Sequence, residues 1–156
     1  MPHDPINNPA HYTVYPVQPI EITRYLGFCL GNAVKYVLRA PYKGGVEDCL
    51  KALAYLENEQ DCPQPCIGLP YFNRLLISLK SLHIYFASAD VDMLWRDIAD
   101  EQDHFLRVLH SYLYSGDPGD IPQMMGSVRD LRRILSLRDT TGQIYESMSG
   151  MPKCCQ

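Results

Sequence analysis

No run of apolar residues in this sequence approaches the length that a membrane-spanning helix needs, which is about 20 residues. The first nine residues are polar and rich in proline, and they lack the apolar core of a secretory signal peptide. We therefore expect a cytoplasmic protein with no membrane partner.

Several motifs of nucleotide-handling and hydrolytic enzymes are also missing. The sequence has no Walker A pattern, no GxGxxG, no GxSxG and no HExxH. With a net charge of −4, it lacks the dense basic surface that duplex nucleic acid requires, so duplex nucleic acid is not expected as a partner. A local basic pocket for a small phosphate ligand stays open.

The six cysteines form no CxxC pair. Cys62 and Cys66 stand four residues apart in a proline-rich segment without a nearby histidine, which favours free thiols over a zinc site. Cys29 and Cys49 fall on apolar helix faces and are predicted to be small buried residues. We assign no metal ligands.

What the sequence does contain is helical periodicity. Hydrophobic residues make up 46% of the chain, recur at spacings of three and four, and form no alternating run long enough for a sheet. The prediction is an all-α fold, a compact helical bundle with an extended N-terminal arm. Helices are expected at residues 20–25, 28–39, 46–59, 71–87, 91–114 and 122–137. Residues 1–60 then form an arm and a helical hairpin, 61–138 the back half of the same domain, and 139–156 a flexible tail.

The helix expected at 28–39 has two distinct faces. Its buried side is predicted to hold Leu30, Ala33, Val34, Val37 and Leu38, and its opposite face Asn32, Lys35, Tyr36 and Arg39. Pro41 ends this helix, because the residue before a proline avoids the helical region. The next helix is expected to bury Val46, Leu50, Leu53, Ala54 and Leu56, with Asp48, Lys51 and Tyr55 on a more polar side.

The turn Lys43-Gly44-Gly45 between these helices is a candidate phosphate site. Two glycines allow backbone N–H groups to point at one spot near a helix N-terminus, where the dipole adds positive potential. Lys35 and Arg39 stand one turn apart on the preceding helix, and arginine offers a planar fork for phosphate oxygens. The alternative is a solvated helix face followed by an ordinary turn.

The arm contributes a second candidate in Asn8-Pro9-Ala10-His11-Tyr12. His11 is suited to donate to a phosphate or to act as an acid or base near neutral pH, and Tyr12 to stack on a nucleobase. The alternative is a capped turn with an exposed histidine.

The front half resembles a known family. Asn8 to Tyr12, Glu21, Gly31 to Arg39, Lys43 to Asp48, Lys51-Ala52 and Tyr55-Leu56 are similar in order and spacing to the SaV-like domain of phage and prophage proteins. That family includes the T7-type phage nucleotide kinase, which phosphorylates deoxynucleoside monophosphates without a Walker A loop. The resemblance covers roughly residues 5–59.

The resemblance implies a nucleoside monophosphate kinase in a phage-infected or lysogenic bacterial cell. His11, Lys35, Arg39 and Asp48 would be catalytic. Asn8, Tyr12, Asn32, Tyr36, Lys43, Gly44, Gly45 and Lys51 would bind nucleotide or phosphate. ATP would be the phosphate donor, and Mg²⁺ is a possible cofactor that Asp48 would hold, unless Asp48 orients a lysine.

Two other functions stay open. A non-catalytic phage protein that sequesters nucleotides or nucleotide signals of host defence would need the same pocket. A binder of a host protein would use the aromatic-rich back half, although core packing explains those aromatics more simply. A homo-oligomer is expected, because a short hairpin gives an open pocket that a neighbouring subunit would close.

Overall fold

In a computed structural model of the chain, residues 6, 14–15, 17–66 and 93–149 are described, with side chains up to residue 142. These residues form α1 (Ile20–Thr23), α2 (Phe28–Arg39), α3 (Gly45–Asp61), α5 (Met93–Ser115) and α6 (Asp120–Ser149), and no strand occurs among them. The predicted all-α fold is confirmed.

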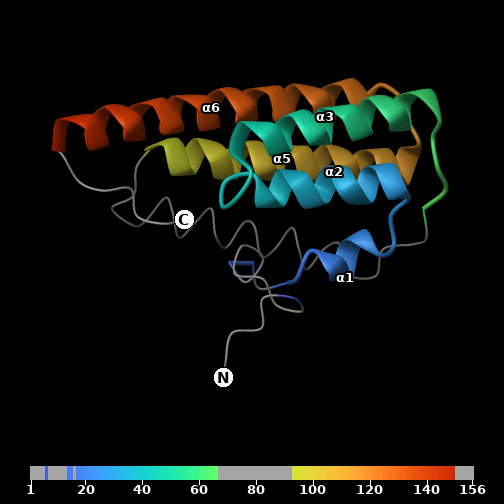
Figure 1. Ribbon diagram of the computed structural model, residues 1–156. Coiled ribbons are helices and arrows are strands. Elements are labelled where there is room, and N and C mark those ends of the chain that lie inside the picture. The colour runs from blue at the N-terminus through green and yellow to red at the C-terminus, as the bar shows by residue number, and fades with distance from the viewer. Residues whose placement is uncertain (1–5, 7–13, 16, 67–92, 150–156) are drawn as a thin grey trace.

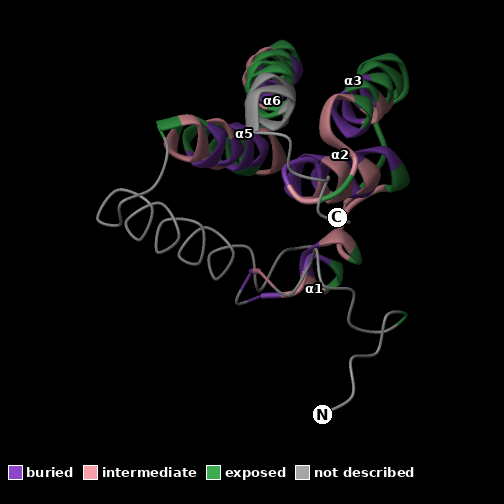
Figure 2. Ribbon diagram, turned by 60° about the vertical axis from the view of Figure 1, so that its left-hand side comes forward, coloured by how far each residue is buried: buried purple, intermediate pink, exposed green. Residues whose placement is uncertain are grey.

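The four long helices lie side by side in a bundle (Figure 1). α2 and α3 form an antiparallel hairpin, α5 and α6 form another, and α3 packs against α6. Short α1 lies against α2. Figure 2 shows the buried residues of the four long helices turned toward one another. The two hairpins therefore share one core, and the outer side of α2 and α3 faces away from it.

Helix α2 agrees with the prediction from the sequence. It has the expected bounds, and all five residues of its predicted apolar side are at most 1% exposed: Leu30, Ala33, Val34, Val37 and Leu38. Cys29 and Cys49 are buried, as predicted. The first turn of α2 receives a cap from far along the chain, because the Phe28 amide donates to Gln64 Oε1 at 3.1 Å.

Pro41 creates a hydrogen-bonding problem at the end of α2 that other segments solve. Proline has no N–H to donate back to the Val37 carbonyl. Gln102 of α5 donates to that carbonyl at 3.1 Å and also to the Tyr15 hydroxyl at 3.0 Å. The Tyr15 hydroxyl in turn donates to the Leu38 carbonyl at 2.9 Å. The turn after α2 is thus fixed by α5 and by the segment that precedes α1.

Helix α3 differs from the prediction in which side it buries. Leu50 is 47% exposed and Ala54 is also exposed, although both were placed in the core stripe. The buried stripe instead includes two carboxylates, Asp48 and Glu59, which are both 0% exposed. The prediction counted only apolar residues as buried and therefore placed the buried stripe of α3 too far around the helix. Asp48 and Glu59 can be buried because polar partners accompany them.

One helix of the back half is longer than the sequence predicted. α6 was expected to end near Leu137 and to be followed by a flexible tail, but it continues to Ser149. The helix expected at 71–87 and residues 150–156 lie outside the described residues. None of the helices in the described part combines the length and apolar composition required to cross a membrane.

Glu59 shows what a buried carboxylate requires. Its Oε1 accepts from the Gln64 amide at 3.2 Å and from the Tyr112 hydroxyl at 3.4 Å, whereas its Oε2 is buried without a hydrogen-bond partner. Burial raises the pKa of Glu59, although the two donors act in the opposite direction. The ionised side chain is therefore a net cost to the fold.

Replacing Glu59 with glutamine is expected to change how stability depends on pH. A raised pKa in the folded state gives a stabilising contribution that is complete below the unfolded value, about pH 4.3, and is lost as the pH rises through the folded value. Glu59→Gln stays neutral throughout, so its stability relative to the parent protein should increase between pH 4 and pH 7. Urea unfolding of both proteins across this range measures the difference, and a difference independent of pH would contradict the assignment.

Candidate functional site

The polar side of α2 and the adjoining side of α3 form a surface that we call the α2–α3 outer face. It consists of Phe28, Asn32, Lys35, Tyr36, Arg39, Lys51 and Tyr55. The first five follow the helical spacing of three to four residues along α2, with Lys35 and Tyr36 adjacent, and therefore share one side of that helix. Lys51 and Tyr55 are one turn apart on α3.

Three cationic groups converge on the ring of Tyr36. Lys35 Nζ lies 4.5 Å from the ring centroid, Arg39 Cζ 4.9 Å and Lys51 Nζ 5.7 Å. Each is within the range at which a cation is attracted to an aromatic ring. The structure thus brings together four residues that were predicted to bind phosphate or nucleotide.

The aromatic residues of this face contact one another in a row. Tyr36 and Tyr55 are stacked with ring centroids 5.9 Å apart and an interplanar angle of 14°. Phe28 meets Tyr55 nearly edge-on at 5.7 Å and 74°. These contacts fix the rings relative to each other across the two helices. Phe28 and Tyr55 were not predicted as site residues, although Phe28 lies four residues before Asn32 and so follows the same helical spacing.

Arg39 and Asp48 form a closely bonded ion pair across the hairpin. Arg39 Nε donates to Asp48 Oδ2 at 2.8 Å, and Nη2 donates to Oδ1 at 2.6 Å. The Asp48 side chain is 1% exposed and that of Arg39 is 19% exposed. Both carboxylate oxygens are therefore engaged with an arginine, and Asp48, which was predicted on the more polar side of α3, is buried, unlike Lys51 and Tyr55.

The carboxylate of Asp48 also explains why residue 44 is glycine. A Cβ atom at Gly44 would stand 2.0 Å from Asp48 Cγ, which no side chain permits. Gly45 has a positive φ of 53°, which favours glycine as well. The amides of Lys43 and Gly45 donate to the carbonyls of Arg39 and Ala40 at 3.0 and 2.8 Å. In this conformation these two amides close the turn instead of facing a ligand, and phosphate binding by Lys43, Gly44 and Gly45 stays a prediction.

The two lysines of the cluster have different partners. Lys35 Nζ donates to Asn32 Oδ1 at 2.9 Å, and Asn32 Nδ2 donates to the Phe28 carbonyl at 2.8 Å, so Asn32 holds Lys35 in place. Lys51 pairs with Glu47 at 2.6 Å, and that hydrogen bond raises the pKa of Lys51. The Asn32 oxygen that accepts from Lys35 is neutral, so the full positive charge of Lys35 remains on the outer face.

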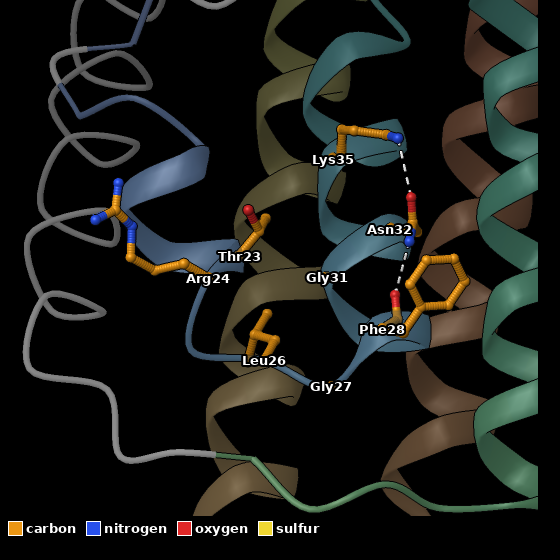
Figure 3. Close-up of a pocket in the computed structure, with 8 residues that line it drawn as sticks. All are labelled: Thr23, Arg24, Leu26, Gly27, Phe28, Gly31, Asn32 and Lys35. Carbon is orange, nitrogen blue, oxygen red and sulfur yellow. Dashed lines mark hydrogen bonds between the residues drawn. The ribbon is translucent and has the colours of Figure 1, made fainter.

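A cavity of about 340 Å³ adjoins the outer face between α1 and the first turns of α2. It is lined by Thr23, Arg24, Leu26, Gly27, Phe28, Gly31, Asn32 and Lys35. Figure 3 shows Phe28, Asn32 and Lys35 following one another along one side of α2, with Thr23 and Leu26 on the other side of the cavity. Its volume lies within the range of small-ligand sites.

The carboxylates of this region are not arranged to bind Mg²⁺. Mg²⁺ needs oxygen ligands that face it, but both oxygens of Asp48 are bonded to Arg39 and Glu47 is paired with Lys51. In the described part of the chain, no group of three His, Cys, Asp or Glu residues is arranged to hold a metal ion. Asp48 thus orients an arginine here, and the Mg²⁺ that the resemblance implies has no described ligand set.

The arm residues predicted for the site, Asn8, His11 and Tyr12, lie outside the described residues.

Sequence reasoning missed the residues that support the site from a distance. Gln64 caps α2, and Arg138 of α6 donates to the Pro41 carbonyl at 2.7 Å with its guanidinium 5.6 Å from the ring of Trp95. No local sequence pattern predicts contacts between residues so far apart in the chain.

Comparison with known proteins gives one match. No curated protein and no solved structure matches the chain. A family profile described as a protein of unknown function, DUF3310, matches residues 6–57. This segment is about a third of the chain and contains α1, α2 and most of α3. Over these residues, which include the whole α2–α3 outer face, the chain is similar to the DUF3310 family.

Proposed function

We propose that the α2–α3 outer face binds the phosphate groups of a nucleotide. The observation that carries the proposal is the convergence of Lys35, Arg39 and Lys51 on the ring of Tyr36. A ligand with a negative charge would be attracted by this concentration of positive charge. Within the cluster, Asp48 and Glu47 compensate Arg39 and Lys51, which leaves the charge of Lys35 for a ligand.

The neighbouring aromatic row supports a nucleotide over a simple anion. Phosphate alone needs only positive charge and N–H donors, whereas a ligand with a base also needs an apolar surface. Phe28 and the cavity beside it lie a few residues along α2 from Lys35. The resemblance to the SaV-like domain independently favours a nucleotide.

Replacing Lys35 with alanine is expected to weaken nucleotide binding by about 10- to 100-fold, the worth of one charged hydrogen bond. Calorimetric titration with the four deoxynucleoside monophosphates measures the change. Arg129→Ala is the matched control, since it removes one positive charge from an exposed position of α6 and should leave affinity within about twofold. Equal effects of the two variants would mean that only overall charge matters.

Phosphoryl transfer in this site is a second proposal. Such reactions depend mainly on positioning and on stabilising charge in the transition state, and clustered cations supply that stabilisation. The prediction from the resemblance is that ATP phosphorylates a deoxynucleoside monophosphate. A coupled assay detects the ADP formed. Nucleotide binding without ADP would favour the sequestering function over the kinase.

Partners other than nucleotides stay predictions. The homo-oligomer expected from the sequence is tested by light scattering, where a monomer mass at micromolar concentration would contradict it. A host protein as partner, suggested by the aromatic-rich back half, involves several residues outside the described part of the chain.

A further inference from the structure

We propose that the ring of Phe28 and the cavity beside it hold the base of the bound nucleotide, which makes Phe28 a specificity-determining residue. This inference rests on the proposed function, because it assumes that the phosphate lies near Lys35. It assigns the other end of the ligand to residues that neither the sequence motifs nor the similarity to DUF3310 identifies.

The first argument is the unusual exposure of Phe28. Its side chain is 65% exposed, although it stands at the first position of a well-packed helix. Its position is nevertheless defined, because its amide is bonded to Gln64 and its ring contacts Tyr55. An exposed aromatic ring that is held in place is suited to stacking against a planar ligand and loses little entropy on binding.

The second argument is the distance between the two ends of the site. Phe28 and Lys35 are seven residues apart on one helix, which corresponds to about 10 Å along its axis. They lie on the same side of α2, as Figure 3 shows. In a nucleoside phosphate the sugar separates the base from the phosphate, so a ligand of this class can reach from the ring to the ammonium group.

The third argument is the lining of the cavity beside these two ends. Gly31 has no side chain, and a Cβ there would come within 3.2 Å of the Thr23 carbonyl, so α1 lies close against α2 at this point. Asn32 lies down along the helix, bonded to Lys35 and to the Phe28 carbonyl. Leu26 and Thr23 line the same cavity, and they offer the ligand one apolar and one polar side chain beside Phe28.

The experiment compares ligands with and without a base. Phe28→Ala, Phe28→Trp and the parent protein are titrated with the four deoxynucleoside monophosphates and with 2-deoxyribose 5-phosphate. We expect Phe28→Ala to weaken binding of at least one deoxynucleoside monophosphate by about 10-fold or more, consistent with a lost stacking contact, and to leave the base-free sugar phosphate unchanged. Phe28→Trp should keep the affinity.

Two controls separate the possible outcomes. Tyr114→Ala removes a ring from the end of α5 that is even more exposed, at 91%, and this change should not affect binding. Circular dichroism and the melting temperature show whether each variant is folded. Equal losses for both kinds of ligand, or no loss in Phe28→Ala, would overturn the role of Phe28 but leave phosphate binding intact. If the parent protein binds none of these ligands, the proposed function fails as well.

Discussion

Replacing Asp48 with alanine is expected to lower the free energy of unfolding by about 3–5 kcal/mol, the usual cost of removing one partner of a buried ion pair. The side chain of Asp48 is 1% exposed and accepts two hydrogen bonds from Arg39 across the hairpin. Without it, the arginine is left in a half-buried position with its compensating charge gone. Urea unfolding at neutral pH measures the change.

An ion pair on the surface provides the control. Arg133 and Asp130 of α6 form a pair at 2.8 Å, but their side chains are 73% and 49% exposed. Asp130→Ala should therefore cost at most about 1 kcal/mol. A cost for Asp48→Ala as small as that for Asp130→Ala would show that the buried pair does not hold the hairpin together.

The second large effect is expected at Gln102. Gln102→Leu keeps the volume of the side chain but removes both donors, which leaves the Val37 carbonyl without the donor that the structure gives it. Pro41 cannot replace that donor, because proline has no N–H. A buried carbonyl left unsatisfied costs about 1–3 kcal/mol, and we expect Gln102→Leu to lose about 2–3 kcal/mol of stability.

Tyr15→Phe tests the same hydrogen-bond network at Tyr15, the residue that Gln102 also contacts. It removes one hydroxyl that donates to the Leu38 carbonyl and accepts from Gln102. Because these residues share a hydrogen bond, the losses in the double variant should be smaller than the sum of the single losses. Additive losses would indicate that Gln102 and Tyr15 stabilise the turn independently.

The sequence predicted helix α2 well because its signals are local. Its buried residues repeat at helical spacing, and Pro41 follows directly after its last turn. The failures on α3 have a different origin. Leu50 looked buried and Asp48 looked exposed because their types suggest so, but the burial of Asp48 depends on Arg39, nine residues earlier on another helix. Such a pairing exists only after the hairpin has closed.

The same limit applies to the candidate site. Helical spacing alone placed Asn32, Lys35, Tyr36 and Arg39 on one face, and the structure shows them there. Which cations then meet depends on how α3 is rotated, so Lys51 joins Lys35 and Arg39 at the Tyr36 ring. Lys43, which the sequence grouped with Lys35 and Arg39, is exposed at the turn.

The ion pair also changes what is expected of Arg39. The place of Arg39 opposite the buried side of its helix would by itself predict that Arg39→Ala reduces phosphate binding and barely affects stability. In the structure Arg39 is bonded to Asp48, so loss of stability is now expected as well. Lys35, whose acceptor is the neutral Asn32, is therefore the cleaner position at which to test phosphate binding.

The most direct test of the central claim is a titration of the isotope-labelled protein with a deoxynucleoside monophosphate, followed by amide chemical shifts in NMR spectra. If the α2–α3 outer face binds the phosphate, the largest changes should fall on α2 and α3, at Asn32, Lys35, Tyr36 and Lys51. Lys35→Ala should reduce these changes at the same ligand concentration. Changes confined to α5 and α6, or no change at millimolar nucleotide, would contradict the account.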